Sequence, residues 1–281
     1  MSSINLNSTS LLLTQRILRF NTRQQADSLS RLATGLRINR GQDDPAGLIT
    51  SENLRAILKA LEAETRSIQR AEDVINVAEG ALSEVSDLLG EAQALTVKNA
   101  NTAGLSAAEK EANQMELDSI LSTINRLSSS TTFNEDKLLD GTASITVDGQ
   151  QVNIDSVSTG SLGTTTVGSE TYTLSDLKRG GKLNIESGDL SIAQDVLASA
   201  RISVASQRGN LGAFARNAIG SRLKIIAVMT GNISAANSKI RDTDYASETA
   251  NFARLKVLLE SSLKSVKLAG AQPLTALNLL A

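Results

Sequence analysis

Apolar residues recur at intervals of three and four positions from residue 54 to residue 92. One column holds large side chains, namely Leu54, Leu61, Ile68, Ile75, Leu82 and Leu89. The second column has Glu64 as its charged interruption and otherwise consists of Ile57, Ala71, Ala78, Val85 and Ala92. This alternation is the heptad of a coiled coil. Extended over residues 46–98, it predicts one helix of about 50 residues, about 75 Å long, which packs as a rod against partner helices.

Capping residues place a first helix before this rod. Ser8 to Ser10 are suitable N-caps, and the helix ends near Thr34, because Gly35 is a natural stop. Asp44 and Pro45 then have the residue types of an N-cap and a first helical position, so they begin the long helix. The first helix has an interrupted apolar face, and we expect packing against another element to stabilise it.

Two further helices have the spacing to complete the rod. Ser106 and Glu109 form a capping-box pattern before a helix over residues 107–127, which folds back antiparallel on the long helix. A third rod helix begins near Ser191 and continues the heptad through Leu197, Ala200, Val204, Leu211, Phe214, Ala218, Ile225, Val228 and Ala235. Leu211 and Phe214 join the column of large residues in the predicted rod seam.

A terminal helix closes the chain. Asp244 is its predicted N-cap, and Glu248 lies in its first turn, near the positive end of the helix dipole. We expect this helix to run to Leu268 and to be broken by Gly270 and Pro273. Its apolar face consists of Phe252, Leu255, Leu259, Leu263 and Val266.

The pattern changes to Gly, Thr, Ser and Val between residues 141 and 188. Residues 145–154 alternate apolar and polar side chains around Asp148 and Gly149, which predicts a β-hairpin. Residues 157–173 are rich in Ser, Thr and Gly and indicate a loop or short edge strands. The fold class predicted is therefore mainly α: an antiparallel coiled-coil rod of three or more helices, paired terminal helices and a small β-hairpin element.

Composition excludes several kinds of chemistry. The chain has no Cys and no His, so thiol nucleophiles, disulfides, imidazole bases and the usual zinc and haem sites are excluded. Aromatic residues make up 2% of the chain, which argues against a large aromatic pocket. Asp43 and Asp44 are interpreted as caps, not as a catalytic or metal-binding pair. We therefore expect no enzyme activity, no cofactor and no metal.

Charge is concentrated at the two ends of the chain. Six arginines against one aspartate give residues 1–42 a net charge of +5, and residues 254–281 carry +3, so the middle carries −10. Basic ends are typical of nucleic-acid or membrane binding, but they also suit two ends that meet in one polar assembly, and we favour the assembly. No apolar run approaches the 18 or so residues of a membrane span, and the N-terminus lacks the order of a cleavable signal peptide.

Five motifs in order resemble those of bacterial flagellins. The first is LATGLRINRGQDDPAGL at residues 32–48, with its Gly-Leu-Arg-Ile-Asn and Asp-Asp signatures. The others are AEGAL at 78–82, TTFNEDKLLDG at 131–141, SQRGNLGA at 206–213 and SKIRDTDYASE at 238–248. The resemblance implies a structural subunit that polymerises into the flagellar filament for swimming motility. It also implies a secreted, extracellular protein that is exported without a cleaved signal peptide.

The resemblance further implies partners and a division of the chain. The partners would be other copies of the chain, an export chaperone, the export apparatus and the filament cap, with no nucleic acid or membrane. Inner-core helices would occupy residues 1–43 and 238–281, rod helices 44–140 and 189–237, and a small β-rich element 141–188 in place of outer domains. Subunit contacts in the filament core would involve Leu32, Gly35, Leu36, Arg37, Ile38, Asn39, Asp43, Asp44, Gly47, Ile240, Asp242, Asp244, Tyr245, Phe252, Leu259 and Leu263.

Two alternatives stay open on the sequence alone. A hook–filament junction protein of the same family shares the terminal helices and the Asp-Asp-Pro loop. A dimeric coiled-coil adaptor would also use the rod, but it does not explain five ordered motifs.

Overall fold

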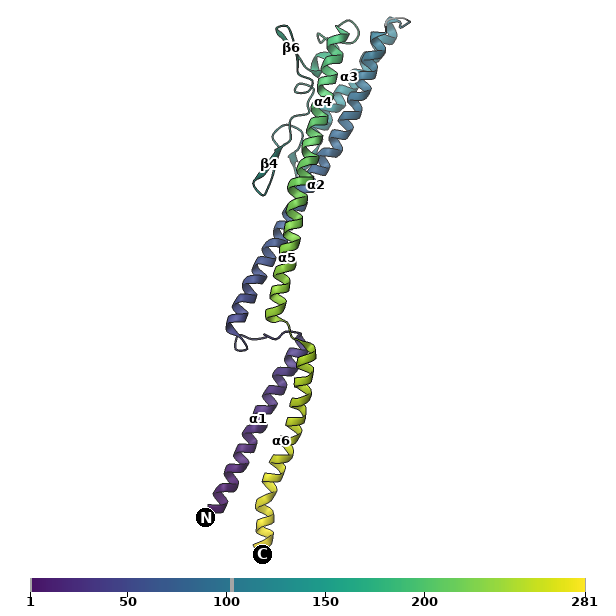
Figure 1. Ribbon diagram of the computed structural model, residues 1–281. Coiled ribbons are helices and arrows are strands. Elements are labelled where there is room, and N and C mark those ends of the chain that lie inside the picture. The colour runs from purple at the N-terminus through teal and green to yellow at the C-terminus, as the bar shows by residue number, and fades with distance from the viewer. Residues whose placement is uncertain (1, 102–103, 281) are drawn as a thin grey trace. The chain divides into compact units, whose positions relative to one another are not determined.

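The computed structural model describes residues 2–101 and 104–280, with side chains described for residues 11–101 and 104–271. Residues 102–103, between the helices predicted over residues 46–98 and 107–127, lie outside this range. The α-helices, shown in Figure 1, are α1 (Ser2–Thr34), α2 (Pro45–Ala100), α3 (Ala107–Ser130), α4 (Leu190–Phe214), α5 (Gly220–Arg241) and α6 (Tyr245–Leu280). The predicted fold class, mainly α with a small β element, is confirmed.

The chain forms two compact units. The first comprises residues 1–61 and 229–281, and therefore holds α1, α6, the start of α2 and the end of α5. The second comprises residues 62–228 and holds the rest of α2, together with α3, α4 and the strands.

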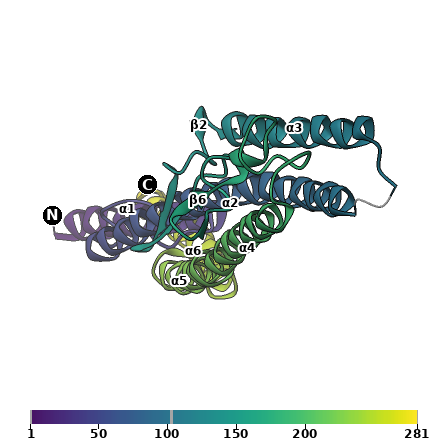
Figure 2. The same cartoon turned by 90° about the horizontal axis from the view of Figure 1, so that it is seen from above.

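In the second unit α3 and α4 lie beside α2 (Figures 1 and 2). The capping box predicted for α3 is confirmed, because the Ser106 hydroxyl accepts from the Glu109 amide and the Glu109 carboxylate accepts from the Ser106 amide. On the other side, Arg208 Nε of α4 donates to Glu79 Oε1 of α2 at 2.8 Å. The apolar seam between these helices includes Ala78, Leu82, Val85, Leu89, Leu117, Leu121, Ile124, Leu197, Ala200, Val204 and Leu211, all buried.

Three antiparallel strand pairs flank the helices. They are β1 (Thr132–Phe133) with β2 (Asp136–Lys137), β3 (Ser144–Val147) with β4 (Gln150–Asn153), and β5 (Thr165–Val167) with β6 (Glu170–Tyr172). The hairpin predicted around Asp148 and Gly149 is confirmed, and both turn residues have the positive φ that a two-residue hairpin turn requires, 52° and 77°. A short 3₁₀-helix, Leu174–Leu177, follows the last strand.

Burial along the long helix follows one predicted column more closely than the other. Leu61, Ile68, Ile75, Leu82 and Leu89 are buried, and Leu54 is half-buried. Ile57 of the second column was predicted to face a partner but is exposed. In the first unit α2 faces α5, where Ser51 Oγ donates to Asn237 Oδ1 at 2.7 Å. One neighbouring helix covers one column, so the second column is buried only where further elements pack on α2.

The heptad predicted for the third rod helix is wrong beyond Phe214. A π-helical turn, Ala215–Ile219, separates α4 from α5, and the Gly220 amide donates to the Ala215 carbonyl. A π turn adds one residue, so every later side chain moves round the helix by one position, about 100°. The predicted Ile225 and Val228 are consequently exposed, Ala218 is half-buried, Ala235 is exposed, and the buried residues are Ile219 and Ile226.

Both terminal helices are longer than predicted. Helix α1 starts at Ser2 instead of at Ser8 to Ser10, although it ends at Thr34 as expected. Helix α6 continues to Leu280, through Gly270 and Pro273, which were predicted to end it at Leu268. Glycine and proline cost a helix interior about 1 and 3 kcal/mol, and tertiary context routinely overrides such local preferences.

Candidate assembly site

The two terminal helices pair within the first unit. Helices α1 and α6 run antiparallel, with both chain ends at the same end of the pair (Figure 1). The contact is largely polar: Asn21, Ser28 and Ser262 are buried, and Asn21 Nδ2 donates to Ser262 Oγ at 3.1 Å. Among the described positions of the two helices, Leu255 is the only large apolar residue that is buried. The pair therefore has little apolar core of its own.

A short backbone ladder joins the end of α1 to the chain before α6. Leu36 and Asp242 form an antiparallel bridge, in which the Arg37 amide donates to the Arg241 carbonyl at 2.7 Å. The Thr243 amide donates to the Gly35 carbonyl at 2.8 Å. Gly35 has a φ of +73°, and a Cβ there would lie 2.8 Å from the Tyr245 hydroxyl. A glycine is therefore needed at this crossing.

The loop between α1 and α2 is closed by two aspartates. Asp43 Oδ2 accepts from the amides of Asn39 and Arg40 at 3.0 and 2.8 Å, and the Arg40 amide is the main reason that the pKa of Asp43 is lowered. Asp44 Oδ1 accepts from the Gly47 amide at 2.9 Å and so caps α2. Both carboxylates therefore accept hydrogen bonds from backbone amides. Ile38 is buried beneath the loop, with 1% exposure.

Charged and polar side chains hold α2 and α5 together near the same loop. Arg241 Nη1 and Arg55 Nη1 both lie 2.8 Å from Glu52 Oε1. The Arg241 side chain is the main cause of the lowered pKa of Glu52, and Arg55 adds to it. Asp244 Oδ1 caps α6 by accepting from the amides of Ala246 and Ser247 at 3.0 and 3.2 Å.

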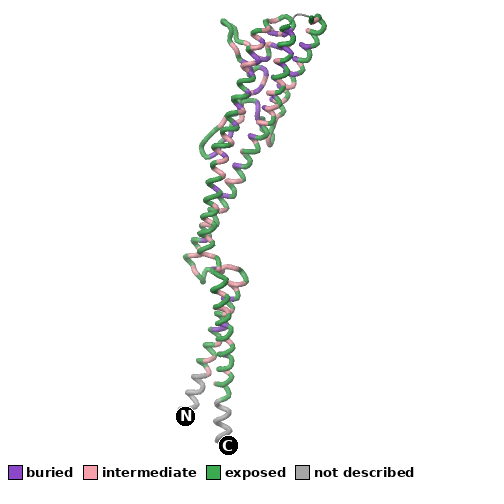
Figure 3. Tube along the Cα trace, turned by 45° about the vertical axis from the view of Figure 1, so that its right-hand side comes forward, coloured by how far each residue is buried: buried purple, intermediate pink, exposed green. Residues whose placement is uncertain are grey.

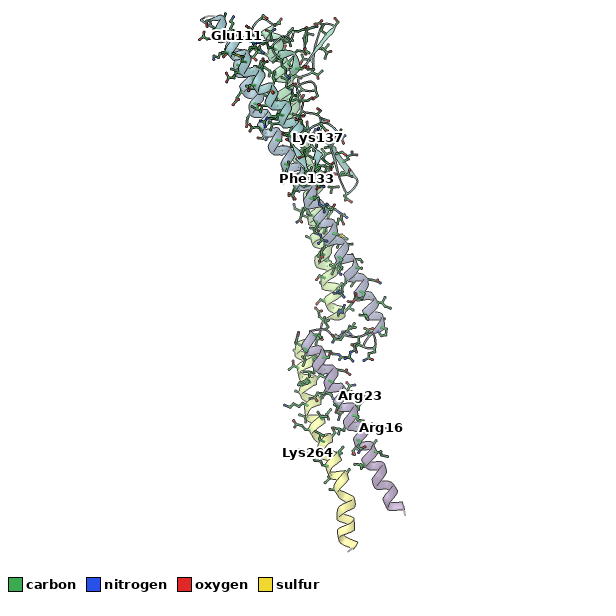
Figure 4. All side chains as sticks on the ribbon, turned by 180° about the vertical axis from the view of Figure 1, so that it is seen from behind. Arg16, Arg23, Glu111, Phe133, Lys137 and Lys264 are labelled. Carbon is green, nitrogen blue, oxygen red and sulfur yellow. The ribbon has the colours of Figure 1, made fainter. Side chains whose placement is uncertain are left out.

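Large apolar side chains on both helices of the pair are exposed. Most of the described length of the two helices is coloured as exposed in Figure 3. Phe20 and Leu268 are 60% and 68% exposed. The others are Leu12, Leu13, Ile17 and Leu29 on α1, and Tyr245, Val257, Leu258 and Leu263 on α6. Basic residues lie among them: Figure 4 labels Arg16 and Arg23 on α1 and Lys264 on α6.

The structure gathers most of the predicted contact residues at the junction. Gly35, Leu36, Arg37, Ile38, Asn39, Asp43, Asp44 and Gly47 form the loop, and Ile240, Asp242, Asp244 and Tyr245 lie on the strand-like segment and helix ends opposite. Leu32, Phe252 and Leu259 are half-buried along the helix pair, and Leu263 is exposed.

Sequence reasoning missed several contacts. Asn21 with Ser262, Ser51 with Asn237, and Arg241 with Glu52 were not predicted. Ser51 lies one position off the second predicted column, which continues back from Ile57 to Thr50, so the heptad did not place it in the seam. Its pairing with Asn237 was not detectable either, because a polar pair 186 residues apart leaves no periodic signal.

Within the described ranges, no group of His, Cys, Asp and Glu side chains is arranged to hold a metal ion. None of the described helices has the length and apolarity needed to cross a bilayer.

Comparison with known proteins identifies the family. The model of the bacterial flagellin N-terminal helical region matches residues 4–144, and that of the C-terminal helical region matches residues 195–280. A flagellar filament 30.7 kDa core protein of Treponema maltophilum is 33% identical over 94% of this chain and 95% of its own length. A flagellin of Bacillus subtilis is 30% identical over 99% of each chain.

Among solved structures, the Bacillus cereus flagellin crystal structure covers 60% of this chain and 88% of its own, with 18% identity and a TM-score of 0.40. The matched family models cover both helical ends of the chain, and the relatives extend over almost all of it. The chain therefore belongs to the bacterial flagellin family and is a structural subunit of the flagellar filament, not an enzyme.

Proposed function

We propose that the α1–α6 pair and the junction at residues 35–47 and 238–248 form the surface through which subunits join in the filament core. The observation that carries this proposal is the row of large exposed apolar side chains on both helices, Phe20 and Leu268 among them. A helix pair that remained in water would gain nothing from these residues. A neighbouring subunit that covered them would contribute about 1.5–3 kcal/mol for each fully buried side chain.

The weak core of the pair supports the same proposal. The buried contact between α1 and α6 is mostly polar, and such hydrogen bonds add only about 0.5–1.5 kcal/mol each to stability. Ordering two long helices costs conformational entropy that this contact offsets poorly. Burial against neighbouring subunits therefore supplies much of the stabilisation, and folding of the pair is coupled to assembly.

The five segments have separate roles in this proposal. Residues 1–43 and 238–281 supply the inner core, and the junction sets the geometry of the two helix ends through the ladder at Leu36 and Asp242. Residues 44–140 and 189–237 supply the outer rod, stiffened by the seam from Leu54 to Leu89 with Leu211 and Phe214. Residues 141–188 replace the outer domains with a small β element.

Export partners follow from the family and belong to the proposal. The filament is extracellular, so the chain leaves the cell, and we propose that it does so through the flagellar export apparatus with a chaperone and is placed by the filament cap. Mass spectrometry of the N-terminal peptide from filaments tests this, since a cleaved leader would contradict it.

Seeded polymerisation tests the assembly surface. The full chain and a chain ending at Leu259 would each be added to filament fragments and followed by electron microscopy. The full chain should elongate the seeds. The shortened chain should stay monomeric, with a second unit that still unfolds cooperatively. Normal filaments from the shortened chain would contradict the proposal, and failure of the full chain to elongate would contradict filament function itself.

A further inference from the structure

A small pocket lies between the two terminal helices of the first unit, and its volume is about 190 Å³. The residues that line it come from both helices: Thr14, Ile17 and Asn21 of α1, and Leu258, Ser261, Ser262 and Ser265 of α6. None of these residues is charged. A cavity of about 150 Å³ is enough to hold one benzene ring, whereas sites for drug-sized ligands have volumes of about 300–1,000 Å³. The pocket therefore has the size of a site for one aromatic side chain.

Four of the five polar side chains that line the pocket have hydrogen-bond partners within the helix pair. Asn21 Nδ2 donates to Ser262 Oγ at 3.1 Å, and Ser262 Oγ donates to a backbone carbonyl of α6. Thr14 Oγ1 and Ser265 Oγ donate to carbonyls of their own helices at 2.9 and 3.0 Å. Ser261, the fifth, is exposed. An apolar side chain can therefore enter the pocket without depriving these groups of their partners.

Phe20 carries an exposed aromatic ring on the same helix pair. It is 60% exposed and lies about 60° round α1 from Ile17, but it does not line the pocket itself. Four of the six Phe and Tyr residues of the chain are half-buried, namely Phe133, Tyr172, Phe214 and Phe252. Tyr245 is exposed too, but its hydroxyl lies at the junction, where it limits the space beside Gly35. Phe20 is therefore the exposed ring that the junction does not use.

We propose that the pocket of one subunit receives the Phe20 ring of a second copy of this chain. This inference rests on the assembly surface proposed above and names one contact within it. The chain is a filament subunit, so the molecules that surround its terminal helices in that assembly are copies of itself. The pocket and the ring both lie on the α1–α6 pair, so each subunit gives one ring and receives another.

Truncation of the ring tests this contact. Sedimentation of the filaments leaves the free subunits in solution, and their concentration at equilibrium measures how tightly each subunit is held. Phe20→Ala should raise this concentration about tenfold or more, the factor that corresponds to the burial of one such side chain. Thermal unfolding of the monomer should not change, because the ring is exposed there.

A size exchange separates the pocket from a general loss of apolar area. Ser265→Phe supplies a ring to the pocket from the same chain, so it should exclude the neighbour's ring and raise the free concentration. Phe20→Ala together with Ser265→Phe should recover part of the lost assembly, because the pocket is filled and no second ring competes for it. Leu29→Ala is the matched control, because Leu29 is 54% exposed on α1 and does not line the pocket. Combined with Ser265→Phe, this control should give no recovery.

Crosslinking shows whether the ring and the pocket belong to different copies. The chain has no cysteine, so Phe20→Cys and Ser261→Cys can be introduced into separate chains without a background of native thiols. Filaments grown from a mixture of the two variants would be treated with a short thiol-reactive crosslinker. Two-chain products should form in these filaments and not in the mixed monomers.

The proposal is overturned if Phe20→Ala assembles like the natural protein, or if the size exchange recovers no more assembly than the Leu29 control. Mixed filaments without two-chain products would also overturn it. A less stable Phe20→Ala monomer would assign the ring to its own subunit and contradict the contact as well. If the chain ending at Leu259 polymerises normally, the proposed assembly surface fails instead.

Discussion

Gly35 holds the most constrained backbone position of the junction. Its positive φ lets α1 end, and its missing side chain leaves room for the Tyr245 hydroxyl at the start of α6. The ladder of Arg37 with Arg241 and Thr243 with Gly35 depends on this crossing. The same residue therefore terminates one terminal helix and positions the other.

Gly35→Ala should destabilise the junction by about 1–2 kcal/mol, the cost of the left-handed region for a residue with a Cβ, with any clash against Tyr245 added to it. Gly231→Ala is the control, because it lies inside α5 with no atom within 4 Å of an added Cβ. Gly231→Ala should raise the free energy of unfolding by about 0.5–1 kcal/mol. Urea unfolding measures both, and equal stabilisation of the two variants would contradict the junction geometry.

The carboxylates of Asp43 and Glu52 make junction stability depend on pH. Hydrogen bonds from the Arg40 amide and from the Arg241 side chain, respectively, hold the pKa of each below its usual 3.8 or 4.5. A lowered pKa in the folded state stabilises the protein above the unfolded pKa, and that contribution is lost as the pH falls through the folded value. Each of the two variants Asp43→Asn and Glu52→Gln should therefore have a lower free energy of unfolding than the natural protein at neutral pH. This difference should shrink below about pH 4. A difference that grew in acid would contradict this assignment.

At the scale of elements, the helices were predictable where one period governs a long segment. The column from Leu61 to Leu89, the α3 capping box and the Asp148–Gly149 hairpin all follow from local pattern. The π turn at Ala215–Ile219 was not predictable, because both Ile225 and Ile226 are apolar and either can continue a heptad. Polar partners such as Asn21 and Ser262 come together only through the tertiary fold.

The π turn decides which of two adjacent isoleucines is buried. Ile226 is 2% exposed and Ile225 is 49% exposed. Ile226→Ala should therefore cost about 2–5 kcal/mol through the lost packing and the cavity, and Ile225→Ala in the monomer about 0.5 kcal/mol or less. Thermal unfolding of the two variants compares them directly. The reverse order would mean that α5 continues the heptad without the extra residue.

The seam of α2 is tested by Ile75, which is 3% exposed. Ile75→Asp should cost about 3–5 kcal/mol, because it buries a charge without a partner. The neighbouring exposed residue gives a matched control, since Asn76→Asp adds the same charge in water and should change stability by about 0.5 kcal/mol or less. An Ile75→Asp protein with an unchanged unfolding midpoint would show that this column does not face the seam.

At the scale of the whole molecule, stability and assembly are assigned to different units. The second unit buries a continuous apolar seam between α2, α3 and α4. The first unit leaves large apolar residues of α1 and α6 in water and buries mainly polar ones between them. In the proposed assembly, the subunit therefore has a folded rod before polymerisation and completes its terminal helices in the filament.

Hydrogen exchange, followed by mass spectrometry on the monomer and on the filament, tests this division most directly. In the monomer, amides of residues 11–34 and 245–271 should exchange much faster than those of residues 75–95, because their helices lack a buried apolar face. Polymerisation should protect the terminal helices strongly and change the seam little. Terminal amides that are already as protected as the seam in the monomer, or that gain no protection in the filament, would contradict the account.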